Sequence, residues 1–136
     1  MSKVILQTLW QALQQEHQGY EHLHRLLQHQ ARLLTGQDHQ GLLSHNPKQM
    51  ALTRQLAELA ATREQLQASL GAASLEQLCQ QLPAALSARI GGRWQELQQQ
   101  ARLCQALNDS NGRLLASQKE WLEHRLGVSE TVYQPA

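Results

Sequence analysis

The chain has 136 residues, of which 41% are hydrophobic, with 26 Leu, 23 Gln, no Phe and a formal net charge of +1. Leu, Gln and Ala favour helix, while the β-branched and aromatic residues that strands prefer are scarce. The composition excludes a β-sandwich, a barrel or an α/β sheet, and its apolar content at low net charge argues against disorder. We expect an all-α fold, an elongated antiparallel bundle of three long helices plus a short helix near 75–82. The bundle domain covers 1–126, and 127–136 form a flexible C-terminal tail.

The first helix is predicted to begin after the N-cap Ser2 and to end at Gly36. One row of positions steps by alternating threes and fours, as a heptad seam does. Gly19 lies beside this row, where it permits a close helix crossing or a local bend. The seam consists of Leu6, Leu9, Leu13, Glu16, Tyr20, Leu23, Leu27, Gln30 and Leu34.

The middle of the chain contains a polar break over 36–46, followed by a strong helix start. In that start Asn46 is the expected cap, and Pro47 takes the first helical position. The second helix should then run to Gly71, with leucines at heptad spacing. A second capping box at Ser74 opens the short helix, which Pro83 ends.

The last helix is predicted from about Ala84 to Leu126. Gly91 and Gly92 lie inside it and leave a bend or a break open. Its seam starts at Ile90, and a second apolar row lies beside that seam. The second row consists of Leu103, Leu107, Leu114 and Trp121.

The sequence does not support nucleic-acid binding, a membrane span or secretion. Twelve basic and eleven acidic residues give no excess charge for nucleic acid, and no apolar run reaches the roughly 18 residues of a membrane span. The N-terminus lacks the pattern of a signal peptide, so we expect a cytoplasmic protein. Cys79 and Cys104 are interpreted as buried apolar side chains rather than a disulfide or nucleophile.

Metal binding and catalysis are also unsupported. Glu21 and His24 form one E-x-x-H half-site, but the second half-site of a di-iron bundle is missing. No two His residues stand four apart for zinc, and no acid–base pair or phosphate-binding loop is present. We therefore expect no metal, no cofactor and no enzymatic activity.

Two polar residues in the seam of the last helix are the most informative anomaly. Asn108 and Asn111 occupy core-facing positions. They could fix the register of a coiled coil, form an Asn-Gly turn between shorter helices, or orient a visiting helix in a groove. The residues themselves leave these three interpretations open.

The segment around these asparagines resembles the FlgN family of flagellar export chaperones. The resemblance covers the whole chain in length and helix order, and it is specific at a short stretch. That stretch contains Cys104, Leu107, Asn108, Asn111, Gly112, Leu114 and Leu115. The resemblance implies a chaperone for the hook–filament junction proteins FlgK and FlgL. Such a chaperone binds their C-terminal helical regions, prevents premature assembly and delivers them to the export gate protein FlhA.

On this hypothesis the last helix receives the client segment in the vacancy that three helices leave for a fourth. Tyr133 in the tail is the candidate contact to the gate, so the membrane is reached only through the export apparatus. The alternative is a structural coiled-coil adaptor that self-associates through its heptads, and a homodimer stays open in both cases. The candidate client-binding residues are Leu103, Leu107, Asn108, Asn111, Leu114, Leu115 and Trp121.

Overall fold

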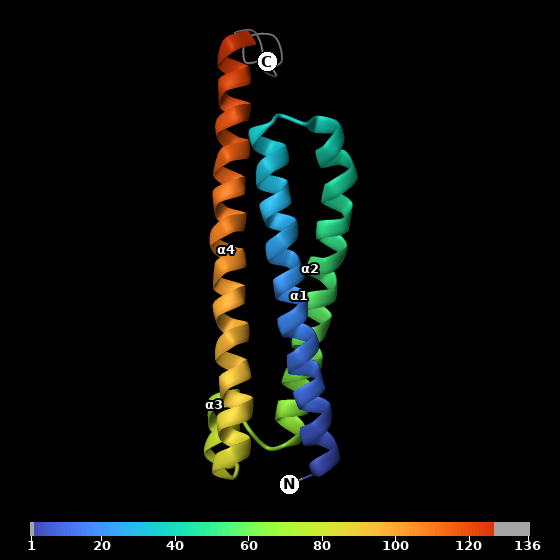
Figure 1. The fold of residues 1–136 in the computed structure, drawn as a ribbon, viewed down its shortest axis with the longest axis vertical. Helices are drawn as coiled ribbons and strands as arrows, with labels where there is room; N and C mark the ends of the chain where they lie inside the picture. The colour runs from blue at the N-terminus through green and yellow to red at the C-terminus, as the bar shows by residue number, and fades with distance from the viewer. Residues whose placement is uncertain (1, 127–136) are drawn as a thin grey trace, which may run out of the picture.

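The computed structural model describes residues 2–126 and contains four helices in that range. They are α1 (Lys3–Thr35), α2 (His39–Ser69), the short α3 (Leu75–Gln80) and α4 (Ala84–Leu126). The three long helices run alternately up, down and up, so α1 and α4 are parallel to each other (Figure 1). The all-α fold, the three long helices and the short helix before Pro83 are confirmed.

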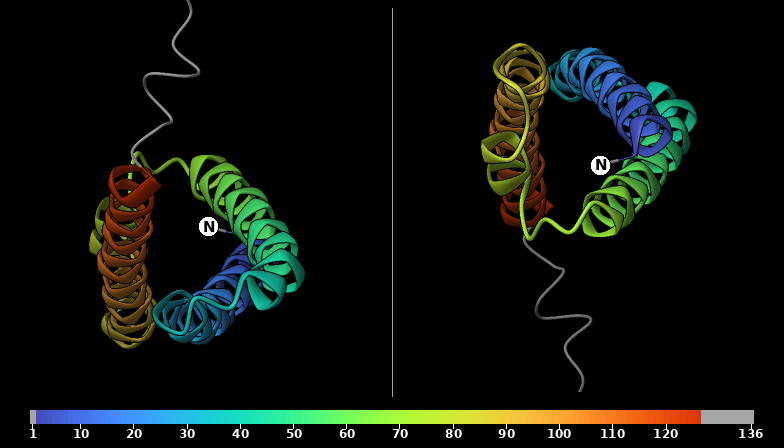
Figure 2. Two further views of the ribbon diagram at one scale, coloured as in Figure 1. Left: turned by 90° about the horizontal axis from the view of Figure 1, so that it is seen from above. Right: turned by 90° about the horizontal axis from the view of Figure 1, so that it is seen from below.

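Helix α1 is the central element, because α2 and α4 both pack along it rather than on each other. Seen along the bundle, α2 and α4 diverge from their common neighbour, and α3 lies against the lower part of α4 (Figure 2). The predicted seam of α1 accounts for this position, since Leu9, Leu13 and Leu27 are almost completely buried. Two apolar clusters form the core, a lower one around Leu9 and Leu13 and an upper one around Leu27.

The start of the second helix differs from the prediction. Helix α2 begins at His39, the loop before it is only Gly36–Asp38, and Pro47 lies inside the helix. Asp38 acts as the cap, since its side chain accepts the Gly41 N–H at 2.8 Å. A proline removes one helical hydrogen bond, but tertiary contacts hold the turns that precede it. His45 in those turns is buried.

Three glycines were singled out in the sequence, Gly19 at a possible close helix crossing and Gly91 and Gly92 at a possible helix break. A Cβ on Gly19 would lie 2.6 Å from the Leu56 Cδ2, so the Leu56 side chain of α2 packs into the space that this glycine leaves on α1. Gly91 and Gly92 lie within one continuous helix, which the structure assigns without interruption from Ala84 to Leu126. The break left open at this pair is therefore absent.

Side chains of α4 donate hydrogen bonds to the main chain of α1 at three successive heptads. The Cys104 thiol, the Asn111 amide and the Gln118 amide donate to carbonyl oxygens at 3.3, 2.9 and 2.7 Å. In each case the acceptor lies 84 residues earlier in the chain, a whole number of heptads. The acceptors are the carbonyls of Tyr20, Leu27 and Leu34. These bonds fix the parallel register of the two helices.

Candidate functional site: an open groove between three helices

A cavity of about 420 Å³ lies between α2 and α4, with α1 as its floor. Seen along the bundle, the ribbons of α2 and α4 stand apart from each other on either side of α1 (Figure 2). No charged side chain is present among the residues that line it. These are Tyr20, Leu23, Leu27, Gln49, Thr53, Leu56, Ala57, Ala60, Ala101, Cys104, Gln105 and Asn108.

The groove stays open because small residues form parts of its two walls. Ala57 and Ala60 on α2 face Ala101 on α4 across it. A methyl group reaches too short a distance to close the space between two helices, whereas leucines at these positions would fill it. The floor is apolar, since Leu23 and Leu27 of α1 belong to the upper core cluster.

Both walls continue beyond the cavity as exposed apolar rows. On α2, Met50 and Leu43 lie seven and fourteen residues before Ala57, and they are 56% and 71% exposed. On α4, Leu115 and Leu122 lie seven and fourteen residues after Asn108, and they are 55% and 51% exposed. Positions seven apart share a helix face. The rows therefore extend an apolar surface along the groove toward the upper end of the bundle.

A chain of polar and aromatic contacts closes the lower end of the groove. The Arg63 Nε donates to the Glu16 Oε1 at 2.8 Å, and the Arg63 guanidinium lies 4.5 Å from the Trp94 ring centroid. The Trp94 Nε1 in turn donates to the Glu76 Oε1 at 2.8 Å, which lowers the pKa of Glu76. Because Glu16 is 1% exposed, its charge requires this partner. The contacts connect all four helices.

A second polar network connects the three long helices at the level of Asn111. The side-chain carbonyl of Gln30 accepts hydrogen bonds from Asn111 at 3.0 Å and from Gln49 at 3.3 Å. The Gln30 amide donates to Asn46 at 3.1 Å. Asn111 is 4% exposed, so its amide is a buried register element rather than an accessible contact. Of the three interpretations left open, register fixing describes Asn111, and the turn is excluded because α4 is continuous there.

The other predicted client-binding residues do not share one face of α4. Asn108 lines the groove, and Leu115 extends the same row. Leu107 is partly buried against the upper core cluster and does not line the groove, and Leu114 is also partly buried. Leu103 and Trp121 are 51% and 57% exposed. Tyr133 and the predicted tail lie outside the described residues.

Sequence reasoning missed the contribution of α2 to the groove. Ala57 and Ala60 line it, while Met50 and Leu43 stand in the row above. A signal was present, since Leu43, Met50 and Ala57 repeat at steps of seven. This repeat indicates a common helix face, but it does not indicate that the space beside Ala57 and Ala60 stays open.

Both cysteine thiols hold their proton more tightly than a free thiol does, which disfavours the reactive thiolate form. Burial raises the pKa of the Cys104 thiol to about 11, and burial also raises the pKa of Cys79. Within residues 2–126 no group of three or more His, Cys, Asp or Glu side chains could hold a metal ion. None of the described helices is long and apolar enough to cross a membrane.

Fold and groove together define a class, the small all-α bundles with an open, uncharged groove along the helices. The family model of the FlgN protein matches residues 1–128. The chain belongs to the FlgN family, and its general role is that of a flagellar export chaperone. A comparison with curated proteins and a comparison with solved structures each give no match.

Proposed function

We propose that this FlgN-family chaperone binds the C-terminal helical segments of the hook–filament junction proteins FlgK and FlgL in the groove between α2 and α4. The observation that carries the proposal is the open position between these two helices. A fourth helix there would complete the bundle and cover the exposed rows on both walls.

The chemistry of the groove suits a client helix with one apolar face. Its floor is formed by the buried Leu23 and Leu27, and the accessible apolar contacts are those of the rows above, such as Met50 and Leu115. A helix bound in a groove contacts it through apolar side chains at positions i, i+3, i+4 and i+7 of that helix. Because no charged residue lines the cavity, the client face is expected to be neutral.

Covering that face explains how the chaperone would act in the cytoplasm. Apolar helix faces that pack between subunits in a finished assembly are exposed in the free subunit, where they promote aggregation or early polymerisation. Folding of the client segment on binding costs several kcal/mol, so the affinity is moderate and release needs no covalent step. The complex would then reach FlhA at the export gate, with Tyr133 as the proposed contact.

Calorimetry with C-terminal fragments of FlgK and FlgL tests the proposal. Leu115→Glu places a charge on the groove row and should weaken client binding at least tenfold. Leu103→Glu is the matched control, since Leu103 is similarly exposed on the same helix but lies outside the row of Asn108 and Leu115. Failure of the folded protein to bind either fragment would contradict the proposal.

The self-associating adaptor makes a different prediction for the same variants. In that case a second copy of the chain covers Leu115 and Leu122, and Leu115→Glu dissociates the oligomer. Sedimentation of the chain alone separates the two functions. A monomer that binds client supports the chaperone, whereas a stable oligomer with no client affinity supports the adaptor.

A further inference from the structure

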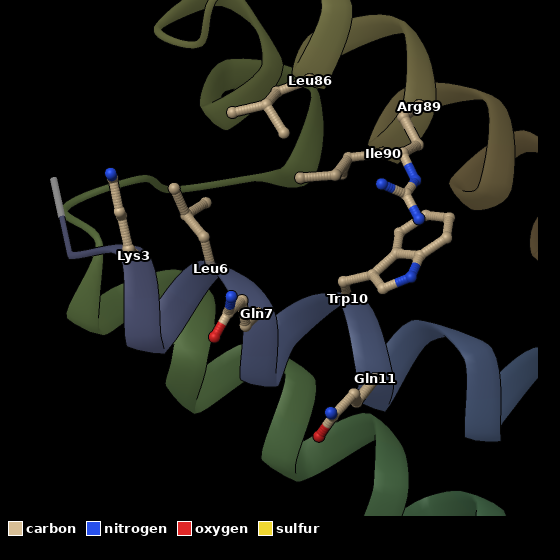
Figure 3. A pocket seen from close by; sticks show the side chains of 8 residues that line it. All are labelled: Lys3, Leu6, Gln7, Trp10, Gln11, Leu86, Arg89 and Ile90. Carbon is tan, nitrogen blue, oxygen red and sulfur yellow. The ribbon is translucent and has the colours of Figure 1, made fainter.

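A second cavity, of about 590 Å³, lies at the base of the molecule between the first turns of α1 and the start of α4 (Figure 3). It shares no lining residue with the groove between α2 and α4. We refer to it as the basal cavity. Its size falls within the range of sites that take a ligand or a few side chains.

The interior of the basal cavity is apolar. Leu6 of α1 points toward Leu86 and Ile90 of α4, and the Trp10 ring closes one end (Figure 3). Leu86 is 38% exposed, so apolar surface is accessible at the mouth. An entering side chain would find aliphatic and aromatic partners on both helices.

Unlike the groove, the basal cavity carries positive charge. Lys3 and Arg89 line it, and no carboxylate is found among its described lining residues. Neither cation forms an ion pair within residues 2–126, whereas the neighbouring Arg93 is paired with Glu96 at 3.0 Å. The first turns of α1 and α4 contain no acidic residue either. Because the two helices are parallel, the positive ends of both helix dipoles lie at this end of the bundle.

The position of Arg89 prepares it to bind a carboxylate. Its guanidinium lies 4.5 Å from the Trp10 ring centroid, in a cation–π contact that restrains the side chain. Stacking on a ring leaves the N–H groups at the guanidinium edge free, and these match a carboxylate in a bidentate arrangement.

We propose that the basal cavity docks an acidic, apolar peptide segment of a partner protein, distinct from the client in the groove. A large apolar side chain of the segment enters between Leu6 and Leu86, and flanking carboxylates bind Arg89 and Lys3. The positive charge of the basal cavity favours an acidic segment over the client helix, whose bound face is expected to be neutral. Because the two sites share no residue, one chaperone can hold both partners at once.

Residues 127–136 cannot reach the basal cavity from the end of α4. Residues 127–136 follow the far end of α4, a helix of 43 residues that spans about 65 Å. Ten extended residues reach about 35 Å at most.

The test uses two synthetic helical peptides of about four turns. Both carry the same stripe of Leu and Phe, flanked by Glu in one peptide and by Gln in the other. The full chain should bind the Glu peptide at least tenfold more tightly in calorimetry. Arg89→Gln should weaken that binding about tenfold, since a charge-assisted hydrogen bond is lost. Arg102→Gln, an exposed cation on the same helix, should leave it unchanged.

A further variant leaves the Arg89–Trp10 contact intact. Leu86→Glu places a carboxylate at the mouth of the cavity and should abolish binding of the Glu peptide, with FlgK fragment binding retained. Equal affinity for the Glu and Gln peptides, or equal binding by wild type, Arg89→Gln and Leu86→Glu, would overturn the proposal. Binding of phenylbutyrate as tightly as the peptide would overturn it as well, by indicating a small-molecule site. Loss of FlgK binding in wild type would contradict the groove proposal alone.

Discussion

The side-chain amide of Asn111 donates a 2.9 Å hydrogen bond to the main-chain carbonyl of Leu27, a residue 84 positions earlier and on a different helix. The same amide donates to the Gln30 side chain at 3.0 Å. Both hydrogen bonds that the Asn111 amide donates thus go to α1, and they hold α4 at the register that places Ala101 and Asn108 beside the groove.

Replacement of Asn111 should therefore affect stability, whereas replacement of Asn108 should not. Asn111→Ala removes the buried hydrogen bond to the Leu27 carbonyl and one partner of the half-buried Gln30 carbonyl, and should lower the free energy of unfolding by about 1–3 kcal/mol. Asn108→Ala is the matched control, because Asn108 is exposed three residues earlier on the same helix. Urea unfolding of the two variants measures the difference. Equal losses would contradict the assignment of Asn111 to register.

The Arg63–Glu16 pair should contribute strongly to the stability of the lower end. Arg63→Ala leaves Glu16 as an unpaired charge with a side chain only 2% exposed, and should cost about 3–5 kcal/mol. Arg54→Ala, at an exposed position of α2, should cost less than about 0.5 kcal/mol. Thermal or urea unfolding gives both values. A loss as small as that of Arg54→Ala would show that the pair does not hold α2 in place.

The Cys104 thiol makes stability depend on pH in the alkaline range. Burial raises its pKa from the ordinary value of 9.0 to about 11, so the folded state binds the proton more tightly than the unfolded state does. The resulting stability is fully present below pH 9 and is lost as the pH rises from 9 to 11. The total is about 2–3 kcal/mol.

The contribution of Cys104 is isolated by comparison with a variant. Cys104→Ala removes the titrating group, so its unfolding free energy should fall less steeply than that of wild type between pH 9 and 11. Identical slopes would contradict the burial argument. Alkylation of the native protein at pH 8 should likewise be slow at Cys104 and become fast on unfolding.

The proposed gate contact at Tyr133 is separable from client binding. Tyr133→Ala should weaken binding of the client-loaded chaperone to the FlhA cytoplasmic region and leave FlgK affinity unchanged. Pull-down with FlhA and calorimetry with the FlgK fragment give the two readings. Unchanged binding to FlhA would remove Tyr133 from the proposal.

Leucine periodicity predicted the helices because burial of an apolar row is a local property of the sequence. The seam of α1 and the caps at Ser2 and Ser74 follow from spacing and turn chemistry alone. The predicted start of α2 was wrong because tertiary contacts, which are not a local property of the sequence, decide where this helix begins. Asn46–Pro47 resembles a helix start, but packing of His45 and the bond from Gln30 to Asn46 extend the helix past it.

The candidate site was harder to predict than the fold. Asn108 and Asn111 have the same chemistry and nearly the same position, and only the register of α1 decides which one is buried. The groove depends on the absence of large side chains at Ala57, Ala60 and Ala101, and an absence gives no apolar signal in the sequence. The contribution of α2 consequently appeared only once three helices were placed together.

The central claim is that a client helix lies in the groove, and filling the groove tests it most directly. Ala60→Phe puts an aromatic ring into the cavity, while Ala61→Phe adds the same ring at an exposed position one residue later. We predict that calorimetry with the FlgK C-terminal fragment shows at least tenfold weaker binding for Ala60→Phe and wild-type binding for Ala61→Phe, with both variants folded. Wild-type affinity for Ala60→Phe would contradict the account.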